Sequence, residues 1–228
     1  MVRTYHEGGP DGSHTRERDR MPKLADHDQR RTQITSAARR VIARDGLAAA
    51  TFQSVAAEAG ISVRLVQYYF GTKRKFLLAT HHAVVADAGA RFTRRLSTLG
   101  AEPAPREVIR AILTELLPTD ADRRRDTIVL NTFHAAALTS TDVGAEDTLG
   151  APRFLARAIA EQLRRARGDA APAAGRASEQ AAGRAAELDA ELIVAGAGGL
   201  AQTLLVDDGA EQRVGELLDR LLDRMVEA

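Results

Sequence analysis

The stretch Thr51–Lys75 constrains the fold most, because it predicts two short helices joined by a tight turn. Thr51 and Ser62 can each cap a helix, since their hydroxyls can accept hydrogen bonds from unpaired amides of the first turn. Gly60 ends the first helix, where positive φ is favoured. The expected inward residues follow helical spacing: Phe52, Val55, Ala56, Ala59, Val66, Tyr69 and Phe70. This pattern is typical of a DNA-binding helix-turn-helix, and the alternative is an ordinary helical hairpin.

The residues around this stretch are strongly basic. From Gln29 to Thr80 there are nine Lys and Arg residues and two acids, a net charge of +7 in a chain whose total is +1. A basic segment in a nearly neutral chain is expected of a surface that binds phosphates. The charge therefore favours the helix-turn-helix over the plain hairpin.

The same region carries a resemblance to a known family. It contains Ile34, Ala37, Ala38, Val41, Ile42, Gly46 and Thr51, then Ala59-Gly60-Ile61-Ser62, Val66, Tyr69-Phe70-Gly71-Thr72-Lys73 and Phe76-Leu77. This pattern resembles the signature of the TetR/AcrR (tetracycline-repressor) family of bacterial transcription regulators over residues 30–80. The resemblance implies an all-α fold with an N-terminal three-helix DNA-binding domain and a C-terminal helical ligand-binding and dimerisation domain. Beyond residue 80 only length and helical pattern are similar.

Base reading requires side chains on the exposed N-terminal part of the second helix of the motif. Arg64 is the candidate for a specific contact, because its guanidinium can pair with both acceptors of guanine, and the alternative is a phosphate contact. The resemblance implies a clamp on the DNA backbone that includes Gln67, where most members have a tyrosine. The predicted DNA-binding residues are Thr51, Gln53, Ser62, Val63, Arg64, Leu65, Gln67, Tyr68, Tyr69 and Lys73.

Lys73 begins the next predicted helix, which runs from about Thr72 to Leu99. A cation is unfavourable at a helix N-terminus unless an anion lies nearby. We expect a DNA phosphate to supply that anion. By resemblance, this helix links the DNA-binding head to the body, and its tilt sets the distance between the two recognition helices of a dimer.

The chain divides into three predicted parts: a disordered tail over 1–28, the DNA-binding domain over 29–76 and the ligand-binding and dimerisation domain over 77–228. The first helix of the DNA-binding domain is expected over 29–45. In the body, 139–152 is expected to be a loop and 168–186 a linker whose second half can join the next helix. By resemblance, the last two long helices, or the helix over 153–167 with that over 187–206, form a four-helix dimer interface.

Asn131 and His134 share one face of an almost wholly apolar helix in the body. Either they line a ligand cavity, or they are polar groups that bond to a neighbouring helix or face an exposed seam. With Phe92 and Gln202 they form the candidate ligand-binding set.

The chain lacks the features of an enzyme, a metalloprotein or a membrane protein. It has no Cys, no HExxH helix and no nucleotide-binding glycine loop, and no apolar run approaching the ~20 residues that span a bilayer. We therefore expect a cytoplasmic protein without cofactor or metal. By resemblance, the expected function is that of a homodimeric repressor that binds a palindromic duplex and is released by a small-molecule effector. The alternatives of the same fold are an activator and a nucleoid-organising protein.

Overall fold

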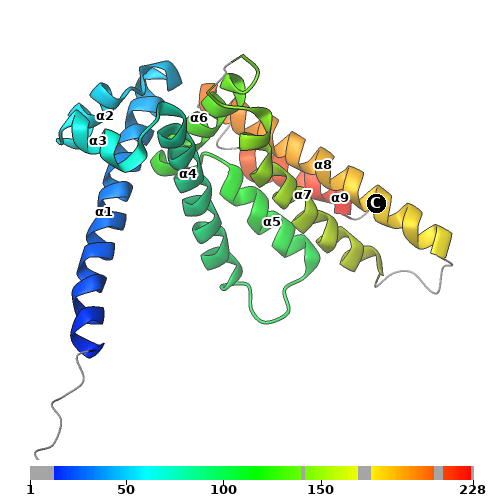
Figure 1. Ribbon diagram of the computed structural model, residues 1–228. Helices are drawn as coiled ribbons and strands as arrows, with labels where there is room; N and C mark the ends of the chain where they lie inside the picture. The colour runs from blue at the N-terminus through cyan, green and yellow to red at the C-terminus, as the bar shows by residue number, and fades with distance from the viewer. Residues whose placement is uncertain (1–12, 140–141, 169–175, 208–212, 227–228) are drawn as a thin grey trace, which may run out of the picture.

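The computed structural model describes residues 13–139, 142–168, 176–207 and 213–226, and within these it contains helices and no strands (Figure 1). The predicted all-α fold is confirmed. The elements in chain order are α1 (Ser13–Asp45), the 3₁₀ turn η1 (Leu47–Ala49), α2 (Phe52–Ala59), α3 (Val63–Phe70), α4 (Lys73–Leu96), α5 (Pro105–Leu116), α6 (Ala121–Ala136), α7 (Ala145–Gly168), α8 (Arg176–Val206) and α9 (Val214–Val226).

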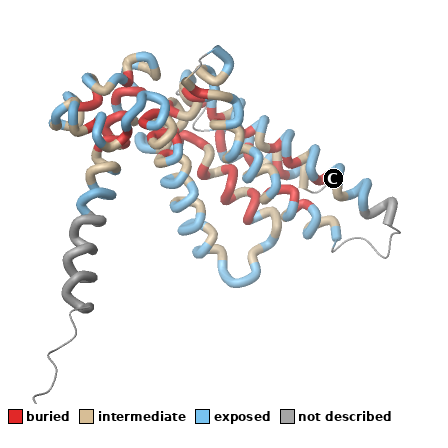
Figure 2. The backbone as a smooth tube through the Cα atoms, viewed as in Figure 1, coloured by how far each residue is buried: buried red, intermediate tan, exposed pale blue. Residues whose placement is uncertain are grey.

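The head consists of the second half of α1 with α2, α3 and the start of α4. The predicted apolar stripe of α1 is confirmed, since Ile34, Ala37, Ala38, Val41 and Ile42 are all buried. These residues pack with buried side chains of the other three helices: Val55, Ala56, Val66, Phe70, Phe76 and Leu77. Figure 2 shows this buried cluster inside the head, and Figure 1 shows the first part of α1 extending away from it.

The body has its own core, formed mainly by α5, α7, α8 and α9. The two cores meet along α4 and α6. Val129 and Phe133 of α6 are fully buried in the head core, together with Val84 of α4. Hydrophobic packing of the head therefore extends past residue 76, where the sequence predicts the domain boundary.

Buried charges also join the head to the body. Asp126 of α6 is 3% exposed and pairs with Arg39 of α1 and with Arg91 of α4, the latter at 2.9 Å. Burial raises the pKa of Asp126, and the two guanidinium groups oppose this rise. Next to it, the buried Glu115 of α5 accepts a hydrogen bond from Arg123 of α6 at 2.9 Å. These pairs cross four helices and fix how the head sits on the body.

Three helix boundaries differ from the prediction. Helix α1 begins at Ser13, so residues 13–28 of the predicted disordered tail are helical, while residues 1–12 lie outside the described residues. Helix α7 begins at Ala145 and contains Pro152, within the predicted loop. Helix α8 begins at Arg176, within the predicted linker. Large apolar side chains are scarce in these segments, so the sequence gives little sign of a helix there, and each segment continues into a helix that packs on the core.

The expectation of no membrane-length apolar run is wrong for α8. Within its 27-residue stretch Gln180–Val206, an 18-residue window has a mean hydropathy of 1.3, enough to cross a bilayer by length and composition. One face of this stretch packs in the body core through Ala186, Ala190, Ile193 and Ala197, as the core helix of a globular domain does. Only 28% of the apolar window is buried, so much of the helix remains uncovered.

Candidate nucleic-acid interface

The turn of the helix-turn-helix is built from the residues that the sequence predicts. The Thr51 hydroxyl accepts a hydrogen bond from the Ser54 amide at 3.1 Å, and the Thr51 amide donates to the Ser54 hydroxyl at 3.0 Å. Gly60 ends α2 in the left-handed conformation with φ 67°. The Ile61 amide then donates to the carbonyl of Ala56 at 3.0 Å. Both ends of α2 are therefore fixed, which sets the angle at which α3 leaves the turn.

Helix α3 presents a polar outer face. Ser62 caps it by accepting a hydrogen bond from the Leu65 amide at 3.3 Å. Val66 and Phe70 are buried beneath it, whereas Arg64, Gln67 and Tyr68 are exposed. Tyr68 has 77% of its surface exposed, although its ring lies edge-on to that of Tyr69 with 5.4 Å between centroids. An exposed Arg, Gln and Tyr on one short helix give it donors and an aromatic ring for a polar partner.

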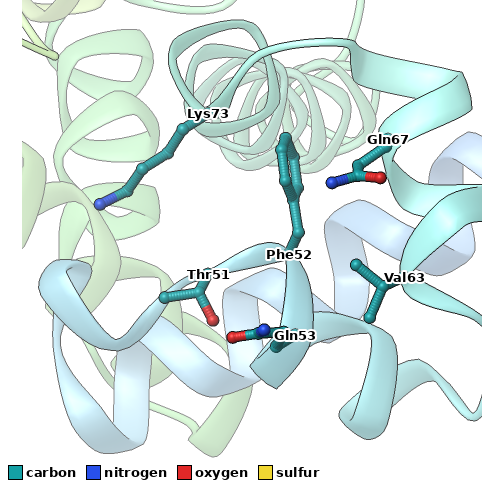
Figure 3. Close-up of a pocket in the computed structure, with 6 residues that line it drawn as sticks. All are labelled: Thr51, Phe52, Gln53, Val63, Gln67 and Lys73. Carbon is teal, nitrogen blue, oxygen red and sulfur yellow. The ribbon is translucent and has the colours of Figure 1, made fainter.

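A hollow of about 260 Å³ lies between α2, α3 and the start of α4 (Figure 3). It brings together Thr51, Gln53, Val63, Gln67 and Lys73 of the predicted DNA-binding set, and adds Phe52, which was predicted only as an inward residue. Thr51 and Thr72 cap the helices that begin at this hollow, and Thr72 accepts from the Lys75 amide at 3.2 Å. Unpaired amides and the positive ends of two helices favour an anion here.

The remaining members of the predicted set do not line the hollow. Ser62, Arg64 and Tyr68 are exposed, while Leu65 and Tyr69 are half-buried. The Tyr69 carbonyl accepts from the Arg31 guanidinium at 3.1 Å, and its ring lies 4.8 Å from the ring of His27. Tyr69 therefore joins α3 to α1 as well as facing outward in part.

Many of the basic side chains of the head have carboxylate partners within the chain. Arg40 and Arg44 pair with Glu58, and Arg74 pairs with Asp147. Among the described residues, Arg64 and Lys75 have no ion pair, so their charges face solvent. Neither Asp147 nor Asp142 is among the residues predicted from the sequence, although a carboxylate oxygen of Asp142 lies 3.9 Å from the Lys73 ammonium. The cation at the start of α4 was the signal that an anion lies nearby.

The four candidate ligand-binding residues differ in burial. Phe92 and Asn131 are half-buried, whereas His134 and Gln202 are exposed. Phe92 packs against the body core. Neither the hollow of the head nor a second hollow between α7 and α8 is lined by any of the four. Their role as a ligand site stays a prediction.

Comparison with known proteins agrees with this geometry. Residues 34–80 match the profile described as "Bacterial regulatory proteins, tetR family". The regulator PksA of Bacillus subtilis (strain 168), described as an HTH-type transcriptional regulator, is 34% identical over 124 residues, which are 54% of this chain and 58% of PksA. A BetI regulator of Burkholderia mallei (strain NCTC 10229) is 42% identical over 93 residues, 41% of this chain and 47% of BetI. The chain thus matches about half the length of these curated relatives.

A solved structure covers more of the chain. A transcriptional regulator of Rhodococcus sp. RHA1 superposes with a TM-score of 0.66 at 25% identity, covering 86% of this chain and 94% of that one. The match spans both head and body, while the profile and the relatives identify the head. The helix-turn-helix head therefore belongs to the TetR family of bacterial regulatory proteins, and the helical body that carries it has the fold of a solved transcriptional regulator.

Proposed function

We propose that this protein is a sequence-specific DNA-binding regulator, a homodimeric repressor that a small-molecule effector releases from a palindromic operator. The observation that carries the proposal is the hollow at the capped starts of α2 and α4, next to the exposed Arg64, Gln67 and Tyr68 of α3. An anion-binding hollow beside an exposed polar helix is what a groove-reading motif requires, because phosphates position the protein while bases specify the sequence.

In this proposal α3 lies in the major groove and the hollow receives a backbone phosphate. Arg64 stands in the first turn of α3, where recognition helices contact base edges. Thr51, Gln53, Gln67 and Lys73 surround the phosphate. The phosphate contacts make affinity fall with salt, whereas the Arg64 contact makes it depend on sequence.

The surface we assign to the dimer is the outer face of α7 and α8. Large apolar side chains stand in solvent there: Phe154 is 64% exposed, Leu188 45% and Leu192 62%. Between the two helices lies a hollow of about 690 Å³. Gly198 and Gly199 of α8 have open space beside them, so a second helix can approach the backbone. Uncovered apolar residues around a hollow are expected of a surface that a partner covers.

Charges on this face suit a second copy of the same chain. Arg153 and Arg157 of α7 line one side of the hollow, and Glu187 and Glu191 of α8 line the other. A two-fold axis brings the same patch of each copy together, so the basic side of one copy can meet the acidic side of its partner. Such a dimer presents two copies of α3, and a spacing of about 34 Å matches one turn of DNA.

The effector part of the proposal is supported by fold likeness alone. A regulator of Saccharomonospora viridis solved in complex with choline superposes with a TM-score of 0.64 at 21% identity, covering 84% of this chain and 96% of that one. We propose that a small molecule bound in the body favours an orientation of α4 in which the distance between the two recognition helices no longer matches the operator half-sites. Its differential affinity for the two settings supplies the free energy of release.

The first test is selection from random duplexes at about 150 mM salt, followed by sequencing of the bound pool. We expect a palindrome with a fixed half-site spacing. Arg64→Ala should then weaken binding to that palindrome about 10- to 100-fold while it changes binding to unrelated DNA less. Arg94→Ala, which removes an exposed charge near the end of α4, is the matched control. Enrichment of no sequence would contradict the operator.

The dimer is tested by sedimentation. Leu192→Asp should give a monomer at micromolar concentration, because it puts a charge among the exposed apolar side chains of the proposed face. Leu138→Asp is the control, since Leu138 is 86% exposed near the end of α6, away from the α7–α8 hollow. A dimer that survives Leu192→Asp but not Leu138→Asp would move the interface to the other surface.

A further inference from the structure

Lys73 has an anionic partner inside the chain. It is the first residue of α4, where the helix dipole disfavours a cation. Its ammonium lies 3.9 Å from a carboxylate oxygen of Asp142, in the segment that joins α6 to α7. Both side chains are close to half exposed, at 43% and 44%. In Figure 3 the Lys73 side chain points away from Gln67 and Val63, across the edge of the hollow.

The segment that carries Asp142 is fixed onto the head. Val143 is fully buried in the head core. The Arg74 guanidinium donates to the Asp142 carbonyl at 2.7 Å and to both carboxylate oxygens of Asp147, at 2.8 and 3.0 Å. The Gly144 amide donates to the same carboxylate at 2.8 Å. A buried anchor and a forked ion pair thus hold the Asp142 carboxylate beside Lys73.

Asp147 is ionised near neutral pH, so it can keep its ion pair with Arg74. The Gly144 hydrogen bond is the main reason that the pKa of Asp147 is lowered, and Arg74 adds to the effect. The carboxylate is therefore ionised wherever the protein would meet DNA. It also lies in the first turn of α7, where a negative charge is favourable.

We infer that the Asp142 carboxylate competes with a DNA phosphate for the Lys73 ammonium. Asp142 is held in place by the buried Val143 and by the two hydrogen bonds from Arg74 to the Asp147 carboxylate. The inference rests on the proposed function, because it concerns the same hollow. To bind a phosphate, the Lys73 ammonium must break its ion pair with Asp142. The Asp142 carboxylate also repels a phosphate that enters the hollow. Since the segment leads directly into α7, a shift of α7 relative to α4 changes the strength of this competition. The body thereby sets the affinity of the head.

The test is Asp142→Asn, which keeps the shape of the side chain and removes its charge. An exposed ion pair of this kind corresponds to a change of up to about five-fold in affinity, so we expect a gain of about three- to five-fold at low salt. The gain should be equal for operator and unrelated duplexes, because a phosphate contact carries no sequence information. The log–log salt dependence should become steeper by about 0.9, the value for one further phosphate contact.

Two further variants separate this contact from a general charge effect. Glu146→Gln makes the same change of charge four residues away, where Glu146 pairs with Arg153, and it should leave affinity within about two-fold. In a Lys73→Met background, Asp142→Asn should give no gain beyond that of Glu146→Gln. An equal gain from both acid substitutions, or a full gain without Lys73, would overturn the inference.

The inference and the proposed function fail in different ways. If the wild type binds duplexes and Asp142→Asn binds them with the same affinity and salt slope, only the competition is wrong. If neither protein binds any duplex at about 20 mM salt, DNA binding itself is wrong and the competition falls with it. If Asp142→Asn binds where the wild type does not, both are supported.

Discussion

His81 makes the stability of this fold depend on pH. It lies in α4, is 3% exposed and contacts the ring of Phe133 at 5.1 Å between centroids. Its Nδ1 has no hydrogen-bond partner among the described residues. Burial, then the nearby His82 and His134, lower the pKa of His81 from 6.5 to about 4, and Asp147 opposes them weakly. The histidine is therefore neutral in the folded protein at pH 7.

The sign of the effect follows from the two pKa values. Between pH 6.5 and about 4 the unfolded chain binds a proton at His81 and the folded chain does not, so stability falls as the pH is lowered. The full difference corresponds to about 3 kcal/mol at 1.36 kcal/mol per pKa unit. From pH 7 to pH 5 the expected loss is about 2 kcal/mol.

His81→Phe is the variant that isolates this loss. Phenylalanine fills a similar volume beside Phe133 and cannot be protonated, so this part of the pH dependence should vanish while stability at pH 7 is kept or raised. The assay is urea unfolding followed by circular dichroism at pH 7 and pH 5, at one protein concentration for all variants. The exposed neighbour His82, changed to Gln, should keep the loss. An equal loss in the wild type and in His81→Phe would refute the argument.

Three further changes test the packing that positions the site. Asp126→Ala should lower the free energy of unfolding in urea by about 3–5 kcal/mol, because two partly buried arginines lose their counter-charge. Asp122→Ala removes the exposed pair with Arg125 and should change the free energy of unfolding by less than about 0.5 kcal/mol. Similar losses in the Asp126 and Asp122 variants would contradict the stabilising role of the buried network. Arg124→Met removes hydrogen bonds at 3.2 and 2.7 Å to the carbonyls of Leu204 and Leu205, in the last turn of α8. Amide hydrogen exchange in that turn should become faster. Unchanged exchange would show that the Arg124 hydrogen bonds do not stabilise the end of α8. Gly60→Ala should destabilise by about 1–2 kcal/mol in thermal or urea unfolding because of its positive φ, whereas Gly89→Ala, inside α4 with open space, should stabilise by about 0.5–1 kcal/mol.

The helix-turn-helix could be predicted because its determinants are local. The caps Thr51 and Ser62, the turn glycine Gly60 and the buried Val66 and Phe70 lie within a few residues of the contacts they make. Five of the ten predicted DNA-binding residues line one hollow, since two capped helix starts and α3 meet there. The prediction that Phe52 faces inward is only half met, because Phe52 is half-buried and forms one wall of the hollow.

The parts that escaped prediction depend on contacts between distant residues. Helix α7 starts at Ala145 because Gly144 and Asp147 cap it and Arg74, 73 residues from Asp147, holds the cap in place. In the sequence, the glycines, Thr and Asp residues and Pro152 of this stretch indicate a loop. The acids Glu146 and Asp147 are the one local signal of a helix start.

Charge counting from the sequence overstates what the head can offer to DNA. Of its nine basic residues, Arg39, Arg40, Arg44, Lys73 and Arg74 form ion pairs within the described part of the chain. A cation already paired inside the protein adds to DNA affinity only if phosphate replaces its carboxylate. Three of the five have partners in the body, Asp126, Asp142 and Asp147, so whatever moves the body alters how much positive charge the head presents. The salt dependence of binding should therefore report fewer phosphate contacts than the net charge of +7 suggests, and the number should rise when these body carboxylates are removed.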